Sequence, residues 1–267
     1  MSVVLRALLL IYCVALHAKP SEKLEFNKKD YVQWKQTLEK TEEMFPESEF
    51  YRIYLGRSLA PLQALHREMG AKDATSLPFS GMDDWNPYYW VRTDWQNNHD
   101  ESLWKDDLKK LWKKIYAPQF KEFIPSDEII DGRQIVLIDF ASSGRSLSNT
   151  KSLLEHYLRK AKRGKIQVWT LGLTRRPINR PDPKDERRRR EIKLPAYIGE
   201  KVKLENYKNF AEYPTYDSSL STLIAPRKTS GKPRPEFDIL RSTVRKFIDK
   251  DPELRCLSSL QKAMTSH

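Results

Sequence analysis

A nearly continuous apolar run, "QIVLID" at residues 134–139, is the feature that most constrains the fold of this chain. Strands of this kind belong to parallel sheets that helices cover on both faces, because neither side of such a strand meets water. A helix is predicted next, over residues 146–162, and "KIQVWTLGL" at 165–173 predicts a further strand. Residues 50–69 show the same order, with a β-rich run, a turn at 56–58 and a helix. Together these segments predict an α/β fold with a parallel-sheet core, flanking helices and a C-terminal helical extension.

The length and composition are those of a globular protein. The chain has 267 residues, of which 39% are hydrophobic, and this is enough to bury a sizeable core. The predicted organisation is a signal peptide at 1–18, an N-terminal helical segment at 19–49, an α/β domain at 50–225, and a linker with a C-terminal helix at 226–267.

The N-terminus has the pattern of a secretory signal peptide. Arg6 precedes an apolar stretch from Ala7 to Leu16, and Ala18 provides a small residue near the expected cleavage point. The stretch is shorter than the roughly 20 apolar residues that a permanent membrane helix needs. We therefore expect a secreted or periplasmic protein with no stable membrane span, the alternative being a buried N-terminal helix.

The net charge indicates the kind of binding partner, and the cysteine and histidine content argues against one kind of metal site. The formal net charge of +12 favours anionic partners, such as phosphates, nucleic acid or lipid head groups. Cys13 would leave with the signal peptide, and Cys256 would then remain as a single cysteine. The five histidines have no metal-ligand spacing, so no metal site built from His or Cys is expected.

The turn after the 134–139 run, "DFASSGRS", carries groups that suit a phosphate. Its hydroxyls, its arginine and the backbone N–H groups at a helix start can all bind phosphate oxygens, and a glycine permits close approach. These residues are Ser142, Ser143, Gly144, Arg145 and Ser146. The alternative is an ordinary strand-to-helix turn in which the serines cap the helix.

The same residues carry a family resemblance. "IVLIDFASSGRSL" resembles the phosphoribosyl-pyrophosphate loop of type I phosphoribosyltransferases, with Asp139 at the second position of the acidic pair and Ile138 at the first. "IYLGRSLAPLQALHREMG" resembles the pyrophosphate loop of that family, with Arg57 at the arginine position. The resemblance covers about residues 50–173 and implies a phosphoribosyltransferase-like core.

The resemblance also implies roles for individual residues. It assigns the ribose 5-phosphate to Ser143, Gly144, Arg145 and Ser146, the pyrophosphate to Arg57 and Ser58, the ribose hydroxyls to Asp139, and the catalytic base position to Ser142. The family uses Mg²⁺, but Ile138 replaces one acid of the pair that organises the sugar site. Asp83 and Asp84 are the candidates for a substitute carboxylate.

Three functions remain open at this point. The first is an exported phosphoribosyltransferase-like protein that binds a phosphorylated sugar or nucleotide with weak or no transferase activity. The second is an active pentosyltransferase that uses phosphoribosyl pyrophosphate, although export would place it where this intracellular metabolite is scarce. The third is a basic nucleic-acid-binding protein that uses Arg187–Arg190.

Four further expectations concern the remaining chain. Residues 30–45 are predicted as a surface helix, 174–195 as a long exposed loop, 206–219 as a Tyr-rich lid, and 237–264 as a closing helix.

Overall fold

Seven strands and a larger number of helices make up the described part of the chain. The computed structural model describes residues 24–71, 74–80, 112–141, 144–176, 188–213, 216–217 and 232–254. Its strands are β1 (Phe50–Leu55), β2 (Ala74–Leu77), β3 (Phe79–Ser80), β4 (Gln134–Phe140), β5 (Val168–Thr174), β6 (Arg189–Lys193) and β7 (Tyr216–Asp217). Its helices are α2 (Lys28–Met44), α3 (Ala60–Glu68), α6 (Ala117–Phe123), α7 (Asp127–Ile130), α8 (Arg145–Lys160), α9 (Lys201–Glu205) and α11 (Pro235–Ile248), with a π-helix, η1 (Trp112–Tyr116), and a 3-10 helix, η3 (Lys208–Phe210).

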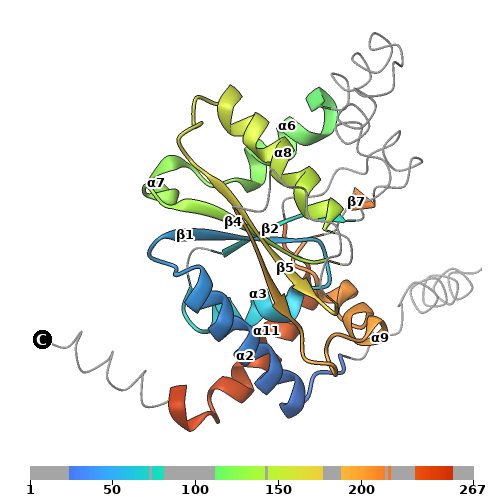
Figure 1. Cartoon of the computed structure of the whole chain (residues 1–267). Coiled ribbons are helices and arrows are strands. Elements are labelled where there is room, and N and C mark those ends of the chain that lie inside the picture. The colour runs from blue at the N-terminus through green and yellow to red at the C-terminus, as the bar shows by residue number, and fades with distance from the viewer. Residues whose placement is uncertain are drawn as a thin grey trace, which may run out of the picture.

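The main sheet has five strands in the order β2-β1-β4-β5-β6, and all neighbouring strands are parallel (Figure 1). Ile53 of β1 lies opposite Leu137 of β4, which lies opposite Thr170 of β5. A second, two-stranded sheet joins β3 to β7. The structure therefore confirms the predicted α/β fold with a parallel-sheet core.

Helices cover both faces of this sheet, as the apolar strands require. Helices α2, α3 and α11 lie on one face, and α6 and α8 lie on the other (Figure 1). Successive residues of β4 point to opposite faces of the sheet. Val136 and Ile138 pack in the core on the side of α2, α3 and α11, whereas Ile135 and Leu137 pack in the core on the side of α6 and α8. All four are fully buried, and each such side chain contributes about 1.5–3 kcal/mol to stability.

Helix α2 belongs to the core to a greater extent than its charged sequence suggests. Asn27 caps its first turn by accepting from the N–H groups of Lys29 and Asp30, and the Asp30 carboxylate accepts from the Asn27 N–H. Trp34 is fully buried against the sheet. The helix is confirmed, but it packs by one face into the core instead of lying only at the surface.

The C-terminal helix α11 packs on α3 and is fixed there by ion pairs. Arg241 lies 2.7 Å and Arg245 lies 3.2 Å from the Glu68 carboxylate, and Leu240 and Val244 are fully buried. The chain segments on either side of the predicted α/β domain therefore pack onto its sheet. The helix ends at Ile248, and residues beyond 254 lie outside the described part.

Two expectations about loops are wrong in part. Within the segment predicted as an exposed loop, 174–195, residues 189–193 form β6, which pairs with β5, and Ile192 is buried in the core. The segment predicted as a Tyr-rich lid contributes Tyr207 and Phe210 to the core, where both are almost completely buried. In both places the local charge or tyrosine content concealed a few residues that pack inside.

Aromatic side chains around α6 belong to the core. Residues 112–123 form η1 and α6, and Tyr116, Phe120 and Phe123 are buried. No helix among the described residues is long and apolar enough to span a membrane.

Candidate ligand-binding site

The order of the strands identifies one end of the sheet as the place for a ligand. From β1 the chain proceeds to β2 on one side and then to β4 on the other, so the direction of winding reverses between β1 and β4. In open parallel sheets, ligands bind outside the carboxyl ends of the strands at such a switch point. The turns after β1 and β4 carry Arg57 and Arg145, and because these two strands are parallel neighbours, both turns lie at this same edge.

The turn after β1 brings an arginine with an unused donor to this edge. Gly56 adopts φ 70°, a left-handed conformation that favours glycine, and its N–H donates to the Leu77 carbonyl over 3.2 Å. The Arg57 Nε is buried, and no described residue accepts its hydrogen bond. Leaving a buried donor unpaired costs about 1–3 kcal/mol, so a ligand that accepts from Arg57 would recover this energy.

The turn after β4 ends in the start of a long helix. The Ala141 N–H donates to the Leu173 carbonyl over 2.9 Å, which extends the β4–β5 pairing up to the turn. Gly144 then adopts φ 75° at the N-cap of the 16-residue helix α8, and no described side chain caps that helix start. The alternative interpretation, in which serines cap the helix, does not hold for the N-cap, because glycine occupies it.

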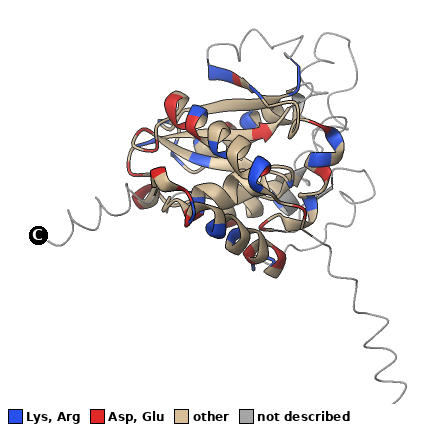
Figure 2. Ribbon diagram, turned by 90° about the horizontal axis from the view of Figure 1, so that it is seen from below, with Lys and Arg blue, Asp and Glu red and all other residues tan. Residues whose placement is uncertain are grey.

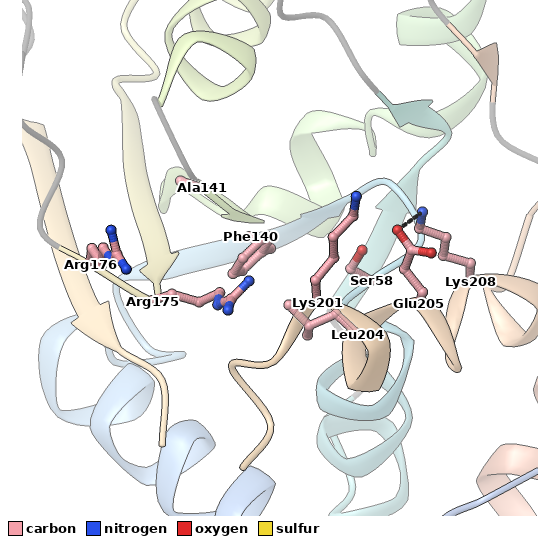
Figure 3. A pocket seen from close by; sticks show the side chains of 9 residues that line it. All are labelled: Ser58, Phe140, Ala141, Arg175, Arg176, Lys201, Leu204, Glu205 and Lys208. Carbon is pink, nitrogen blue, oxygen red and sulfur yellow. Dashed lines mark ion pairs between the residues drawn. The ribbon is translucent and has the colours of Figure 1, made fainter. Parts of the chain in front are cut away.

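A pocket of about 510 Å³ opens between these turns and α9 (Figure 3). The volume falls in the range of about 300–1,000 Å³ that is typical of small-molecule sites. Its walls come from the turn after β1, the end of β4, the residues after β5, α9 and η3, and its lining residues are Ser58, Phe140, Ala141, Arg175, Arg176, Lys201, Leu204, Glu205 and Lys208.

Positive charge dominates the pocket lining. Glu205 is the single acid among the described lining residues, and it forms an ion pair of 3.1 Å with Lys208. A hydrogen bond and the charge of Lys208, with smaller contributions from Lys201 and Arg57, lower the pKa of the Glu205 carboxyl, so Glu205 is ionised at neutral pH. The remaining cations of the lining, Arg175, Arg176 and Lys201, form no ion pair with any described residue.

The side chain of Arg175 is held against the chain that leads to α9. A Cβ added at Gly199 would lie 3.4 Å from the Arg175 Cγ and 3.2 Å from the Pro195 carbonyl oxygen. Glycine therefore lets this segment pass close to the stem of Arg175. The guanidinium points toward Phe140 and Lys201 (Figure 3).

Helix α9, which forms one wall of the pocket, is anchored from behind by a buried ion pair. The Lys203 Nζ lies 3.1 Å from the Oδ1 of Asp30, a fully buried residue of α2. The Tyr207 hydroxyl donates to the same oxygen over 3.0 Å, and burial, followed by the charge of Asp30, raises the pKa of Tyr207 well above its usual value. These contacts fix the position of Lys201 and Leu204 at the pocket.

The residues predicted for the site fall into three groups. Ser58 lines the pocket, Ser146 is half-buried in the first turn of α8, and Gly144 precedes it. Asp139 is half-buried near the end of β4. Ser142, Ser143, Asp83 and Asp84 lie outside the described residues, as does the side chain of Arg145, whose backbone begins α8.

Sequence reasoning missed the cations on the far side of the pocket. Arg175 and Arg176 directly follow β5, and the rule that ligands bind at strand ends could have identified them. Lys201 and Lys208 gave no such signal, because α9 and η3 are short and reach the pocket only through tertiary packing.

Few side chains at this site could bind Mg²⁺. The resemblance implies the metal, and Mg²⁺ at phosphate sites is usually held by one or two carboxylates together with the phosphates. Asp139, the second-last residue of β4, is one candidate, whereas Ile138 is fully buried in the core. The described residues contain no group of three or more His, Cys, Asp or Glu side chains that could hold a metal.

Three arginines of the basic run 187–190 have contacts within the protein, although the buried Nε and Nη2 of Arg189 have no hydrogen-bond acceptor among the described residues. Arg188 lies 3.7 Å from Glu155, Arg189 lies 3.1 Å from Glu191, and the Arg190 guanidinium lies 5.8 Å from the centre of the Trp169 ring. Arg187 is outside the described residues. Figure 2 shows basic and acidic residues mixed along the ribbon. The run is better explained as an edge strand with local partners than as a phosphate-binding surface.

Comparisons of the chain with protein-family models, with curated proteins and with solved structures found no match.

Proposed function

We propose that this protein binds a phosphorylated small molecule, a sugar phosphate or a nucleotide, at the carboxyl edge of its parallel sheet. The observation that carries the proposal is the cationic pocket at the switch point between β1 and β4. A phosphate is the anion that this combination of helix start, guanidinium and hydroxyl groups suits best. The resemblance to the phosphoribosyl-pyrophosphate loop leads to the same ligand class.

In this proposal the phosphate lies at the start of α8. The backbone N–H groups after Gly144 point out of the helix start, the helix dipole attracts negative charge, and the Ser146 hydroxyl is close by in the first turn. Arg57 approaches from the neighbouring turn and donates its unused Nε hydrogen. Arg145, at the first position of α8, would add a second guanidinium.

We propose binding with little or no transfer chemistry. Transfer of a ribosyl group needs charged groups held in place around the ribose, and a displacement of about 1 Å can cost on the order of a hundredfold in rate. Ile138 stands where the resembled family has an acid, and its side chain is buried on the sheet face that packs against α2 and α3. No small adjustment would bring a group at this position into the pocket.

Export belongs to the proposal as well. The signal-peptide pattern at 1–18 would deliver the protein outside the cytoplasm, where it would bind a phosphorylated ligand instead of serving nucleotide salvage.

Calorimetry with a matched ligand pair tests the proposed function. Ribose 5-phosphate and ribose differ only in the phosphate, so we expect the first to bind and the second to bind at least tenfold more weakly. Arg57→Ala should weaken ribose 5-phosphate by about 10- to 100-fold, the range of a charge-assisted hydrogen bond. Lys246→Ala is the control, because Lys246 is exposed on α11.

Two outcomes would overturn the proposal. The first is equal binding of ribose and ribose 5-phosphate, or no binding of either. The second is binding of a single-stranded DNA 20-mer that falls steeply with salt while ribose 5-phosphate shows no affinity. That result would favour the nucleic-acid alternative.

A further inference from the structure

The pocket holds more positive charge than one phosphate group can balance. Glu205 offsets Lys208, which leaves Arg175, Arg176 and Lys201 in the lining. A phosphate monoester carries about −1.5 to −2 at pH 7. About one positive charge of these three lining residues would therefore remain unmatched.

The surplus charge lies away from the proposed phosphate position. Arg57 follows β1 and the phosphate turn follows β4, whereas Arg175 and Arg176 follow β5 on the other side of β4. Neighbouring strands are about 4.8 Å apart, so the ends of β1 and β5 are separated by about 10 Å. Lys201 reaches the pocket from α9, and Arg175 points toward it (Figure 3). One phosphate bound at the start of α8 would leave this second group of cations unengaged.

Apolar side chains also line the pocket. Phe140, at the end of β4, and Leu204, from α9, both line the pocket, and Phe140 lies beside Arg175 (Figure 3). The pocket volume of about 510 Å³ also exceeds what a phosphate alone would fill. A ligand with a flat or apolar middle section would pack against these two side chains while its ends reach the two cationic regions.

We propose that the ligand carries a second anionic group, a carboxylate or a phosphate, which binds between Arg175 and Lys201, while Arg176, on the other side of the end of β5, adds to the positive charge (Figure 3). The inference rests on the proposed function and names its ligand class: a phosphorylated compound with a negative charge at its other end and a ring between. The Arg175 guanidinium can offer a pair of parallel N–H donors, which match the two oxygens of a carboxylate or phosphate.

Pairs of probes that differ by one anionic group test this inference. Uridine 5′-monophosphate is compared with its 6-carboxylate, and adenosine 5′-monophosphate with adenosine 3′,5′-bisphosphate, by calorimetry at fixed ionic strength. We expect at least one of the two probes with a second anionic group to bind tenfold or more tightly than the monophosphate with which it is paired. The pair that shows the effect distinguishes a carboxylate from a phosphate as the second group.

Substitutions separate the two regions of the pocket. Arg175→Gln with Arg176→Gln should reduce the preference for the second anionic group to about one, while monophosphate affinity changes by less than about twofold. Arg57→Ala should weaken both members of each pair and preserve their ratio. Arg175 and Arg176 are exposed, so the double variant should fold normally, and its thermal unfolding is checked against Lys246→Gln as a control.

The outcomes distinguish this inference from the proposed function. If the monophosphates bind but neither second anionic group adds affinity, the second region is refuted and the phosphate site stands. If a preference exists but survives the double substitution, the second region is also refuted. If no probe binds at all, the proposed function fails and the inference fails with it.

Discussion

Replacing Lys203 by methionine should destabilise the protein through the carboxylate that it leaves behind. Asp30 is fully buried and the Lys203 side chain is 10% exposed, with 3.1 Å between Nζ and Oδ1. Breaking a buried ion pair by removing one partner costs about 3–5 kcal/mol. Asp30 keeps two donors, the Asn27 N–H at 2.8 Å and the Tyr207 hydroxyl at 3.0 Å, so part of the penalty is avoided. We expect a loss of about 2–4 kcal/mol.

Chemical unfolding in urea measures this loss, and thermal unfolding gives an independent value. For a domain of this size about 2–4 °C of melting temperature corresponds to 1 kcal/mol, so Lys203→Met should lower the melting temperature by roughly 4–16 °C. Methionine keeps the apolar stem, so the change reports on the charge. The control is Lys201→Met, two residues earlier on the same short helix, where the exposed side chain should change stability by no more than about 0.5 kcal/mol.

A double-mutant cycle with Asp30→Asn tests the cause. If the penalty arises from the unpaired carboxylate, the double variant should be more stable than the sum of the two single losses predicts, by about 1–3 kcal/mol. The reasoning is refuted if Lys203→Met unfolds within about 0.5 kcal/mol of wild type, or if the two losses simply add.

Three further predictions follow from the core and the N-terminus. Burial, with a smaller contribution from Arg52 at 2.6 Å, lowers the pKa of His66, so the unfolded chain takes up a proton before the folded protein does as the pH falls. The free energy of unfolding, measured in urea, should therefore decrease below about pH 6.5, and His66→Gln should flatten this dependence between pH 7.5 and 5.5. Ile138→Asp would bury a carboxylate in the apolar core and should lower the free energy of unfolding by more than about 4 kcal/mol, whereas Ile138→Val should lower it by about 0.5–1.5 kcal/mol. An Ile138→Asp variant that unfolds at the wild-type urea midpoint would contradict this prediction. N-terminal sequencing of the native protein should begin near Lys19, and recovery of Met1 would exclude cleavage.

The burial of Ile138 determines what an acid at this position would do. In the resembled loop an acid here belongs to the pair that organises the sugar site. In the structure the side chain packs into the core on the α2 side of the sheet. The substitution therefore tests the core and not metal binding.

The sheet could be predicted because its signal is local. The apolar run of β4 and the strand–turn–helix order around β1 depend on neighbours in sequence, and the edge at which their turns meet follows from parallel pairing. The turn after β4, for which we propose phosphate binding, was identified in the same way. These parts of the fold and site needed no knowledge of distant contacts.

The rest could not be predicted because it depends on contacts between distant segments. Lys201 lines the pocket on a short helix that Lys203 anchors to Asp30, a residue more than 170 positions earlier in the chain. Likewise, β6 looks like a charged loop because four of its five residues are charged, and only Ile192 indicates that it packs against the core. Neither relation leaves a periodic pattern in the local sequence.

The charge of β6 has a consequence for how copies of this protein meet each other. It is the outermost strand of its sheet on one side, and an outer strand offers backbone groups on which a second copy could add a strand. Arginine and lysine side chains along such an edge repel an identical edge and hinder aggregation. The arginine-rich run that suggests nucleic-acid binding in the sequence would thereby help to keep concentrated solutions of the protein free of β-aggregates.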